Sequence, residues 1–479
     1  MKPLKKIVRA LIPGGILSPK DLLQIIEIVE AMGKDYFFLG SRQDIIFPLG
    51  EDYGKIPAHT GPIRIEHESE DCCKNIVSSY VAAEMLPSTS WVNPSTYLYL
   101  LETFDFAPRL KVNLCDPKQN LVPLFTGNLN FVASEYEDFW YLYLRFDDRQ
   151  RYPSLWPVLI NTWDIAQLVK MLEGLFPGSN PDSVKALFRE VSQAADINTR
   201  TYPQEPEFAY PTFPDYEGMN KIADDRYWLG LYWRNNQYAT DFFRALACFC
   251  MENNIGKICI TPWKSVIIKG ISEKNKAVCE RILGRYGINP RHSSLELNWH
   301  LPVMDQEALD LKRYLVRAFD QNDICTQGLT FSVKNEALVL FTSVVIEKNP
   351  PSQYADRYDL RPTYNVLHCR EFNPNRHHYL TYAQDVEKED LPGILMQLSK
   401  AYYARFYGVQ ELPMPKAAPE PETYPVFRCK HCLSVYDSHF GDPGQTIPAG
   451  TLFEALPDTY HCPLCEASRA AFEPVLLPV

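Results

Sequence analysis

The sequence carries two short cysteine motifs near its C-terminal end, "RCKHC" at residues 428–432 and "HCPLC" at residues 461–465. Each motif separates two cysteines by two residues, a spacing that lets both thiolates bind one metal ion. Together the motifs predict a tetrahedral site with four sulfur ligands, Cys429, Cys432, Cys462 and Cys465. Such a site selects zinc or iron, and the number of ligands alone does not choose between them. A structural zinc ribbon is therefore the simplest alternative.

The composition indicates a large protein with several cores. The chain has 479 residues, of which 46% are hydrophobic, enough for about three to four domains. A net charge of -11 offers no general basic surface, so we expect no nucleic-acid partner. No uninterrupted apolar run approaches the roughly 18 residues that cross a bilayer, so we expect no membrane partner. Arg9 and Pro13-Gly14-Gly15 interrupt the apolar stretch near residue 1, and we expect a cytoplasmic protein.

Nine further cysteines need an explanation, since the chain has thirteen. Disulfides are rare in a reducing compartment. We therefore expect most of the nine to be small hydrophobic core residues. They are Cys72, Cys73, Cys115, Cys248, Cys250, Cys259, Cys279, Cys325 and Cys369.

The large segment before the cysteine motifs looks like a duplication. A helix is predicted after Ser18, which can cap it, and Gly33 ends it before a strand-rich stretch. The same order of helix and strand pair returns at 241–256 and 257–270. Residues 411–424 are rich in proline and charge without periodicity, which predicts a linker.

The segment after the linker resembles rubredoxin. "VYDSHFGDPGQTIPAGTLFEALPDTYHCPLC" at 435–465 follows that family's order of aromatic, acidic, glycine and proline residues, and Phe472 completes its aromatic set. The resemblance covers about 424–479 and implies a rubredoxin-like domain at 425–479. It implies one iron ion (Fe2+/Fe3+) bound by the four cysteines, which carries one electron.

Three positions depart from the rubredoxin pattern. The family commonly has glycine after the second cysteine of each motif, where the turn favours a positive φ, but this chain has Leu433 and Glu466. Tyr460 replaces the usual tryptophan. We expect these changes to alter the packing and charge beside the sulfurs, and therefore the reduction potential.

The large segment resembles the sirohaem sulfite and nitrite reductases. Residues 7–50 are similar to their ferredoxin-like half-domain, with Pro13-Gly14-Gly15 and Arg42-Gln43 at its marked positions. "DCCKNIV" at 71–77 and "APRLKVNLCDPKQNLVPLFTGNLNFVAS" at 107–134 look like the family's next two segments. That family is itself an internal duplication, which agrees with the repeat described above.

The two resemblances imply an α+β fold with duplicated ferredoxin-like half-domains, α/β sirohaem-reductase-like lobes and a small rubredoxin-like metal-binding domain. The predicted boundaries are half-domain 1 at 1–68, lobe 1 at 69–205, half-domain 2 at 206–296, lobe 2 at 297–410, the linker at 411–424 and the metal-binding domain at 425–479.

The resemblance to the reductases also implies a set of basic residues. Reduction of an oxyanion at a haem iron requires cations around the anion and a supply of protons. Lys74, Arg109 and Lys111 occupy basic positions in the two reductase-like segments, and Arg42 could meet a macrocycle carboxylate. They would bind a tetrapyrrole or a small oxyanion. For each residue the alternative is an ordinary solvated surface charge.

The second copy lacks the cysteines of a working reductase. There the family supplies two closely spaced cysteine pairs for a [4Fe-4S] cluster coupled to sirohaem, but residues 297–410 contain only Cys325 and Cys369. We therefore do not expect a [4Fe-4S] cluster, and a coupled sirohaem centre is doubtful. Single residues that could ligate a haem iron alone are Cys369, His368, His377 and His378.

Three interpretations of the function follow. The first, which we favour, is an electron-transfer protein that serves redox donor and acceptor proteins, with a body that has lost its metal centre and docks a partner or a small ligand. Nitrite or sulfite assimilation is suggested only by the family of the body. The second is an oxidoreductase of the nitrite/sulfite reductase type, which binds a tetrapyrrole and receives electrons from the rubredoxin-like domain. The third is a structural zinc protein without a redox role.

Overall fold

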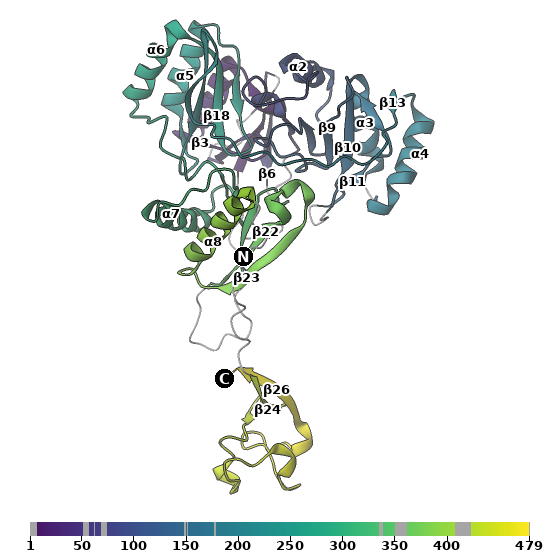
Figure 1. Cartoon of the computed structure of the whole chain (residues 1–479), viewed down its shortest axis with the longest axis vertical. Coiled ribbons are helices and arrows are strands. Elements are labelled where there is room, and N and C mark those ends of the chain that lie inside the picture. Colours follow the sequence, from purple (N-terminus) through teal and green to yellow (C-terminus); the bar gives the residue numbers. More distant parts are fainter. Residues whose placement is uncertain are drawn as a thin grey trace. The chain divides into compact units, whose positions relative to one another are not determined.

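The computed structural model divides the chain into two compact units, residues 1–410 and residues 411–479, and each unit has its own sheets (Figure 1). The residues it describes are 7–50, 57–61, 63–68, 74–147, 150, 152–176, 179–334, 339–349, 362–407 and 423–478. The predicted linker lies outside the described residues, except that Thr423 and Tyr424 already begin a strand. The three predicted boundaries between the four parts of the first unit remain predictions.

The first sheet of the large unit is built mainly from the start of the chain. Its strand order is β16-β3-β4-β1-β6-β5, and β1 is antiparallel to both of its neighbours. The strands from the start of the chain are β1 (Ile7–Leu11), β3 (Tyr36–Leu39), β4 (Ile45–Pro48), β5 (His59–Thr60) and β6 (Ile63–Glu68).

Helix α1 (Pro19–Ala31) forms where the sequence predicts it. The Ser18 side chain caps it by accepting a hydrogen bond of 3.0 Å from the Asp21 amide. Four apolar residues at helical spacing are buried on one face, and this face packs against helix α5 (Thr240–Glu252). The buried residues are Leu22, Ile25, Ile26 and Val29.

A second sheet repeats this arrangement with residues 218–272. Its order is β14-β15-β18-β17-β2, and α5 and α6 lie beside β18 in Figure 1. The elements are β14 (Gly218–Ala223), β15 (Arg226–Tyr232), β17 (Ile258–Ile260), β18 (Ser265–Ser272) and α6 (Glu273–Arg285).

The two sheets exchange one short strand each. Strand β2 (Ile16–Leu17) comes from the first copy but pairs with β17 in the second sheet, while β16 (Tyr238–Ala239) from the second copy pairs with β3 in the first. The order β16-β3-β4-β1-β6 therefore matches β2-β17-β18-β15-β14 strand for strand. Both sheets share one hydrophobic cluster. This topology confirms the predicted duplication.

The remaining two sheets of the large unit are also alike. In one, β7, β8 and β9 are parallel, followed by antiparallel β10 and β12; in the other, β19, β20 and β21 are parallel, followed by antiparallel β22 and β23. The first has strands β7 (Ile76–Ser78), β8 (Val112–Cys115), β9 (Leu129–Ala133), β10 (Phe139–Leu144), β11 (Ser154–Leu155), β12 (Leu159–Asn161) and β13 (Thr199–Arg200), with helices α2 (Pro94–Thr103), α3 (Ile165–Leu175) and α4 (Val184–Ala194). The second has β19 (Trp299–His300), β20 (Phe331–Lys334), β21 (Val344–Lys348), β22 (Tyr364–Cys369) and β23 (Tyr379–Val386), with α7 (Gln306–Gln321) and α8 (Leu391–Ala404) side by side (Figure 1).

The C-terminal unit is a three-stranded antiparallel sheet with long loops. Strand β24 (Thr423–Cys429) lies between β25 (Val435–Tyr436) and β26 (Phe472–Pro478). Its small core is mostly aromatic and includes two of the motif cysteines, Cys429 and Cys462. Across the described part of both units, no helix is long and apolar enough to cross a membrane.

Candidate metal centre

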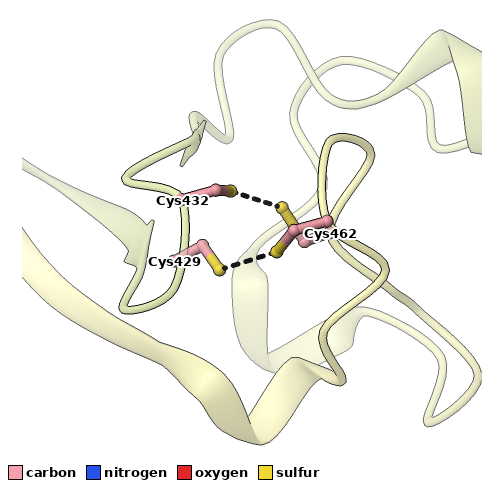
Figure 2. Close-up of side chains that lie close together, drawn as sticks. Cys429, Cys432 and Cys462 are labelled. Carbon is pink, nitrogen blue, oxygen red and sulfur yellow. Dashed lines mark hydrogen bonds between the residues drawn. The ribbon is translucent and has the colours of Figure 1, made fainter.

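The four cysteines of the two motifs meet at one point in the C-terminal unit. Their Sγ atoms all lie within 4.8 Å of one another. Among the described residues, this is the cluster of possible ligand side chains that is close enough to hold a metal ion. Figure 2 shows the sulfurs facing each other from two loops. Cys429 Sγ lies 3.6 Å from Cys465 Sγ, and Cys432 Sγ lies 3.3 Å from Cys462 Sγ.

The two cysteine loops have the same backbone geometry. In each loop, the amide of the first cysteine donates a hydrogen bond of 2.8 Å to the carbonyl oxygen five residues later. Cys429 donates to Ser434 O, and Cys462 donates to Ala467 O. The Leu433 amide returns to Cys429 O at 2.9 Å, and the Glu466 amide returns to Cys462 O at 2.9 Å. These bonds close a tight turn that carries the second cysteine of each pair.

Leu433 and Glu466 occupy the positions where the turn needs a left-handed backbone. Their φ angles are 63° and 57°, a region that non-glycine residues enter at a cost. Both loops nevertheless keep the shape that brings four sulfurs together. The departures from the family pattern therefore change which side chains stand beside the sulfurs, while the turn itself is retained.

Backbone amides point at the sulfur atoms. Cys432 accepts a hydrogen bond from the Ser434 amide, Cys465 from the Ala467 amide, and Cys462 from two amides within its own loop. Burial raises the pKa of the Cys462 thiol, but its backbone donors and the neighbouring thiols outweigh burial and lower the pKa to about 6. The pKa values of Cys432 and Cys465 are instead raised: the Ser434 and Ala467 amides lower them, but burial and the neighbouring thiols outweigh these donors. The surroundings of Cys462 therefore favour the thiolate form that a metal ligand requires.

One edge of the site reaches the protein surface. Cys429 and Cys462 are buried, whereas Cys432 is half-buried and Cys465 is exposed. Leu464, between the second pair of cysteines, is 75% exposed. Two sulfurs thus anchor the site in the core and two face outward.

Aromatic packing supports the buried side of the site. Phe427 stacks on Phe453 with ring centroids 3.9 Å apart, and Tyr460 lies 5.6 Å from Tyr436. Tyr460 is buried and donates its hydroxyl to Asp442 at 3.1 Å. The tyrosine at the usual tryptophan position therefore fills the core and gives its polar end a hydrogen-bond partner.

Comparison with known proteins agrees with this geometry. The family model described as Rubredoxin matches residues 426–472. The chain is 47% identical over 58 residues to Probable Rubredoxin-1 of Methanocaldococcus jannaschii, covering 12% of this chain and 72% of the relative. Through its C-terminal unit, the chain belongs to the rubredoxin family. Rubredoxin-2 of Chlorobaculum tepidum is 46% identical over 46 residues, covering 10% of this chain and 88% of that protein. The four sulfurs of the rubredoxin domain fit one iron ion in a site with four cysteine ligands.

The body resembles a different group of proteins. The family model described as Nitrite/Sulfite reductase ferredoxin-like half domain matches residues 2–50. The solved structure of the Mycobacterium tuberculosis NirA protein matches with a TM-score of 0.62 and 13% identity, covering 85% of this chain and 84% of that one. This likeness establishes the fold and confirms the predicted fold class. The protein is therefore a rubredoxin domain joined to a body with a nitrite/sulfite reductase-like fold.

Arg42, predicted to meet a macrocycle, lies in a buried polar network. Its Nη1 donates to Asn113 Oδ1 at 2.7 Å, and its Nη2 donates to the carbonyl oxygens of Asn75 and Val112 at 2.6 and 3.0 Å. Sequence analysis did not single out Asn75 and Asn113, although an asparagine inside the apolar run "KVNLC" was a visible signal. These contacts fix Arg42 between the starts of β7 and β8, and its role in ligand binding remains a prediction.

The other predicted basic residues lie near the amino ends of the same two strands, β7 and β8. Lys74 and Lys111 are half-buried and precede the paired parallel strands β7 and β8, so both lie at the amino ends of these strands. Arg109 is exposed, and its amide is hydrogen-bonded to Glu173. The fold thus places three basic residues near the amino ends of β7 and β8, and anion binding there remains a prediction.

The nine cysteines outside the two motifs are mainly packing residues. Five of them are buried, as predicted. Cys248 and Cys325 are exposed, and Cys72 and Cys73 lie outside the described residues. Buried Cys369 donates to Thr342 O at 3.4 Å, and Cys325 contacts the Tyr403 hydroxyl at 3.0 Å. His368 is buried, and its Nδ1 forms a hydrogen bond of 3.0 Å with Cys369 O.

Two hollows of the body are too small for a tetrapyrrole. Each has about 10 Å³ of internal space, room for roughly one water molecule. A macrocycle is far larger than either. Sirohaem binding stays the doubtful alternative that it was from sequence, and no step below depends on it.

Proposed function

We propose that the protein transfers single electrons between a redox donor and a redox acceptor through one iron ion bound by Cys429, Cys432, Cys462 and Cys465. The observation that carries the proposal is the convergence of four sulfurs within 4.8 Å in a rubredoxin domain. When bound, the iron supplies a one-electron couple between Fe3+ and Fe2+. The surface edge of the site, at Cys465, gives a short route for the electron to leave.

The chain's own groups support a redox site. Amide donors to Cys432, Cys462 and Cys465 stabilise the negative charge that the thiolates hold, and this charge increases by one unit on reduction. The buried Cys429 and Cys462 keep half of the site away from water, so little solvent must reorganise when the charge changes.

The body acts, in this proposal, as a docking module or a small-ligand binder rather than as a sirohaem and [4Fe-4S] enzyme. Its second lobe has two cysteines, and each has a hydrogen-bond partner within the protein. A fold retained without its original metal centre can take on other work. The fold of the body is what suggests a link with nitrite or sulfite assimilation, and with it a cytoplasmic location.

A visible absorption spectrum with metal analysis tests the proposal. The full-length protein is purified from cells that make sirohaem, and iron, zinc and absorption are measured before and after reduction with dithionite. We expect one iron per chain, thiolate-to-iron charge-transfer bands and reversible bleaching. Additional tetrapyrrole bands would favour the reductase interpretation, and colourless protein with zinc would overturn electron transfer.

A further inference from the structure

The two cysteine loops begin from different supports. The first loop leaves the middle strand of the three-stranded sheet, where β24 pairs with β25 on one side and with β26 on the other. The second loop begins at Tyr460 and His461. There His461 forms an isolated bridge with Ser468, and the Arg469 amide donates to Tyr460 O at 3.2 Å. Both of these partners belong to the returning half of the same loop, so these two contacts do not tie its base to the rest of the unit.

The side chain of Gln445 takes the place of a neighbouring strand. Its Nε2 donates to His461 O at 2.6 Å, and its Oε1 accepts a hydrogen bond of 3.3 Å from the His461 amide. Two residues that exchange both hydrogen bonds in this way form a pair of an antiparallel sheet. Here one side chain supplies both bonds, and it supplies them to the residue immediately before Cys462.

A short turn presents Gln445 to the loop. Gln445 ends the 3-10 helix η9 (Pro443–Gln445), and the Asp442 side chain caps this helix by accepting from the Gly444 amide at 3.0 Å. Thr446 follows with a φ of 59°. A β-branched residue enters this left-handed region at a cost in free energy, and such positions cluster at functional sites.

Asp442 connects Gln445 to the aromatic core. Its Oδ2 accepts from Gln445 Nε2 and from the Tyr460 hydroxyl, both at 3.1 Å. Gln445 Nε2 therefore has two acceptors and Oε1 has one donor, which only one orientation of the amide group satisfies. Tyr460 is buried, and it lies at the position where the family commonly has tryptophan. Its hydroxyl thus belongs to the support of the second cysteine loop.

The supported loop carries backbone amides that point at sulfur. Cys462 accepts hydrogen bonds from the Leu464 and Cys465 amides, and Cys465 accepts one from the Ala467 amide. Hydrogen bonds of this kind stabilise the additional negative charge of a reduced site, and their strength depends on their direction. A rotation of the loop about residue 461 would change all three at once.

We propose that Gln445 is a positioning residue of the redox site. Its two hydrogen bonds to His461 hold the second cysteine loop so that the amides stay aimed at the sulfurs and stabilise the reduced state. This inference rests on the electron-transfer role proposed above and deepens it, because it names a residue outside both cysteine loops that sets the reduction potential. The competing explanation is a hydrogen bond that only stabilises the domain, which would leave the potential unchanged.

Three variants of the full-length iron protein test the proposal. Gln445→Met keeps the length of the side chain and removes both polar groups without adding a charge. Gln445→Asn keeps the amide on a side chain that is one carbon shorter. Thr451→Val is the matched control, because it removes a side-chain hydrogen bond of 2.7 Å to Pro448 O that does not reach either cysteine loop. Reduction potentials are measured by spectroelectrochemical titration, and backbone amide exchange is measured by mass spectrometry.

We expect Gln445→Met to shift the equilibrium between Fe3+ and Fe2+ about tenfold toward Fe3+, which is about 59 mV for one electron. Amide exchange should become faster in residues 461–468 and stay unchanged in residues 428–435. Gln445→Asn should give a smaller shift of the same sign, and Thr451→Val should give none.

An unchanged potential in Gln445→Met would overturn the proposal even if amide exchange becomes faster, and Gln445→Asn decides in the same way if the methionine variant does not retain iron. Equally faster exchange in both cysteine loops would also overturn it, since this would indicate a general loosening of the domain. Reversible bleaching of the wild-type iron colour would in these cases leave the electron-transfer proposal standing, whereas wild-type protein without iron would overturn both.

Discussion

Replacing Glu466 with glutamine should raise the reduction potential of the rubredoxin domain. Glu466 follows Cys465, whose sulfur lies on the exposed side of the site. The carboxylate's negative charge disfavours the addition of an electron to the centre. Glutamine has nearly the same size and meets the same backbone requirement at φ 57°, so the substitution removes the charge and little else.

The size of the shift follows from distance and screening. A carboxylate one residue beyond a ligand lies about 8 Å from the centre of the four sulfurs. For an exposed charge, with an effective dielectric constant of about 40 to 80, Coulomb's law and a one-electron couple give a shift of about 20 to 40 mV. Since the side chain is in water, the shift should shrink as the salt concentration rises from about 0.05 to 0.5 M.

The near-symmetry of the two cysteine loops provides a matched test. Leu433 holds the equivalent place in the first loop, with φ 63° and the same amide bond back to the first cysteine. Leu433→Glu should therefore lower the potential by a similar amount, while Leu433→Gln should lower it less. Potentials are read by spectroelectrochemical titration of the charge-transfer absorption at low and high salt.

The outcome has a clear sign. A rise for Glu466→Gln, a fall for Leu433→Glu and a loss of both shifts at high salt would support an electrostatic origin. An unchanged or lowered potential for Glu466→Gln at low salt would refute it. Equal shifts for Leu433→Glu and Leu433→Gln would instead indicate a change in solvent access.

Three further predictions concern other groups. Cys462→Ala should remove the iron and its colour while leaving the thermal unfolding of the body unchanged, and retained colour would count against the ligand assignment. Replacing Lys74, Arg109 and Lys111 together with alanine should abolish sulfite or nitrite binding in calorimetry, and unaltered affinity would contradict an anion site at this strand edge. Burial lowers the pKa of His377 in the folded protein to about 3, so the unfolded chain binds a proton first as the pH falls. The free energy of unfolding of the body should therefore be highest above about pH 6.5 and decrease as the pH drops towards 3. At pH 4.5 we expect it to be about 3 kcal/mol lower, and denaturant titrations of His377→Asn should not show this decrease.

The metal site could be predicted because its information is local. Two cysteines separated by two residues already define half of a tetrahedral site, and the aromatic and proline spacing between the motifs identifies the surrounding fold. The helix after Ser18 was predictable for the same reason, since the cap and the apolar face lie within one short segment.

The placement of Arg42 could not be predicted in this way. A buried guanidinium and a solvated one have the same sequence signal, and here the partners Asn75 and Asn113 lie 33 and 71 residues away. The small hollow that His377 lines was equally hidden, because its walls come from three distant stretches of chain. The sequence did indicate His377 as a candidate ligand, but not that its Nε2 is buried without a hydrogen-bond partner among the described residues.

By itself the sequence determined the four sulfur ligands, the duplication within the large unit and the family that each of the two units resembles, because these depend on residue spacing and on repeated local patterns. Only the tertiary structure decided how the two copies within the large unit join. Strands β2 and β16 have two residues each, and their pairing partners lie more than 190 residues away in the chain. Segments this short have no periodicity of their own, and burial against the other copy alone makes them strands.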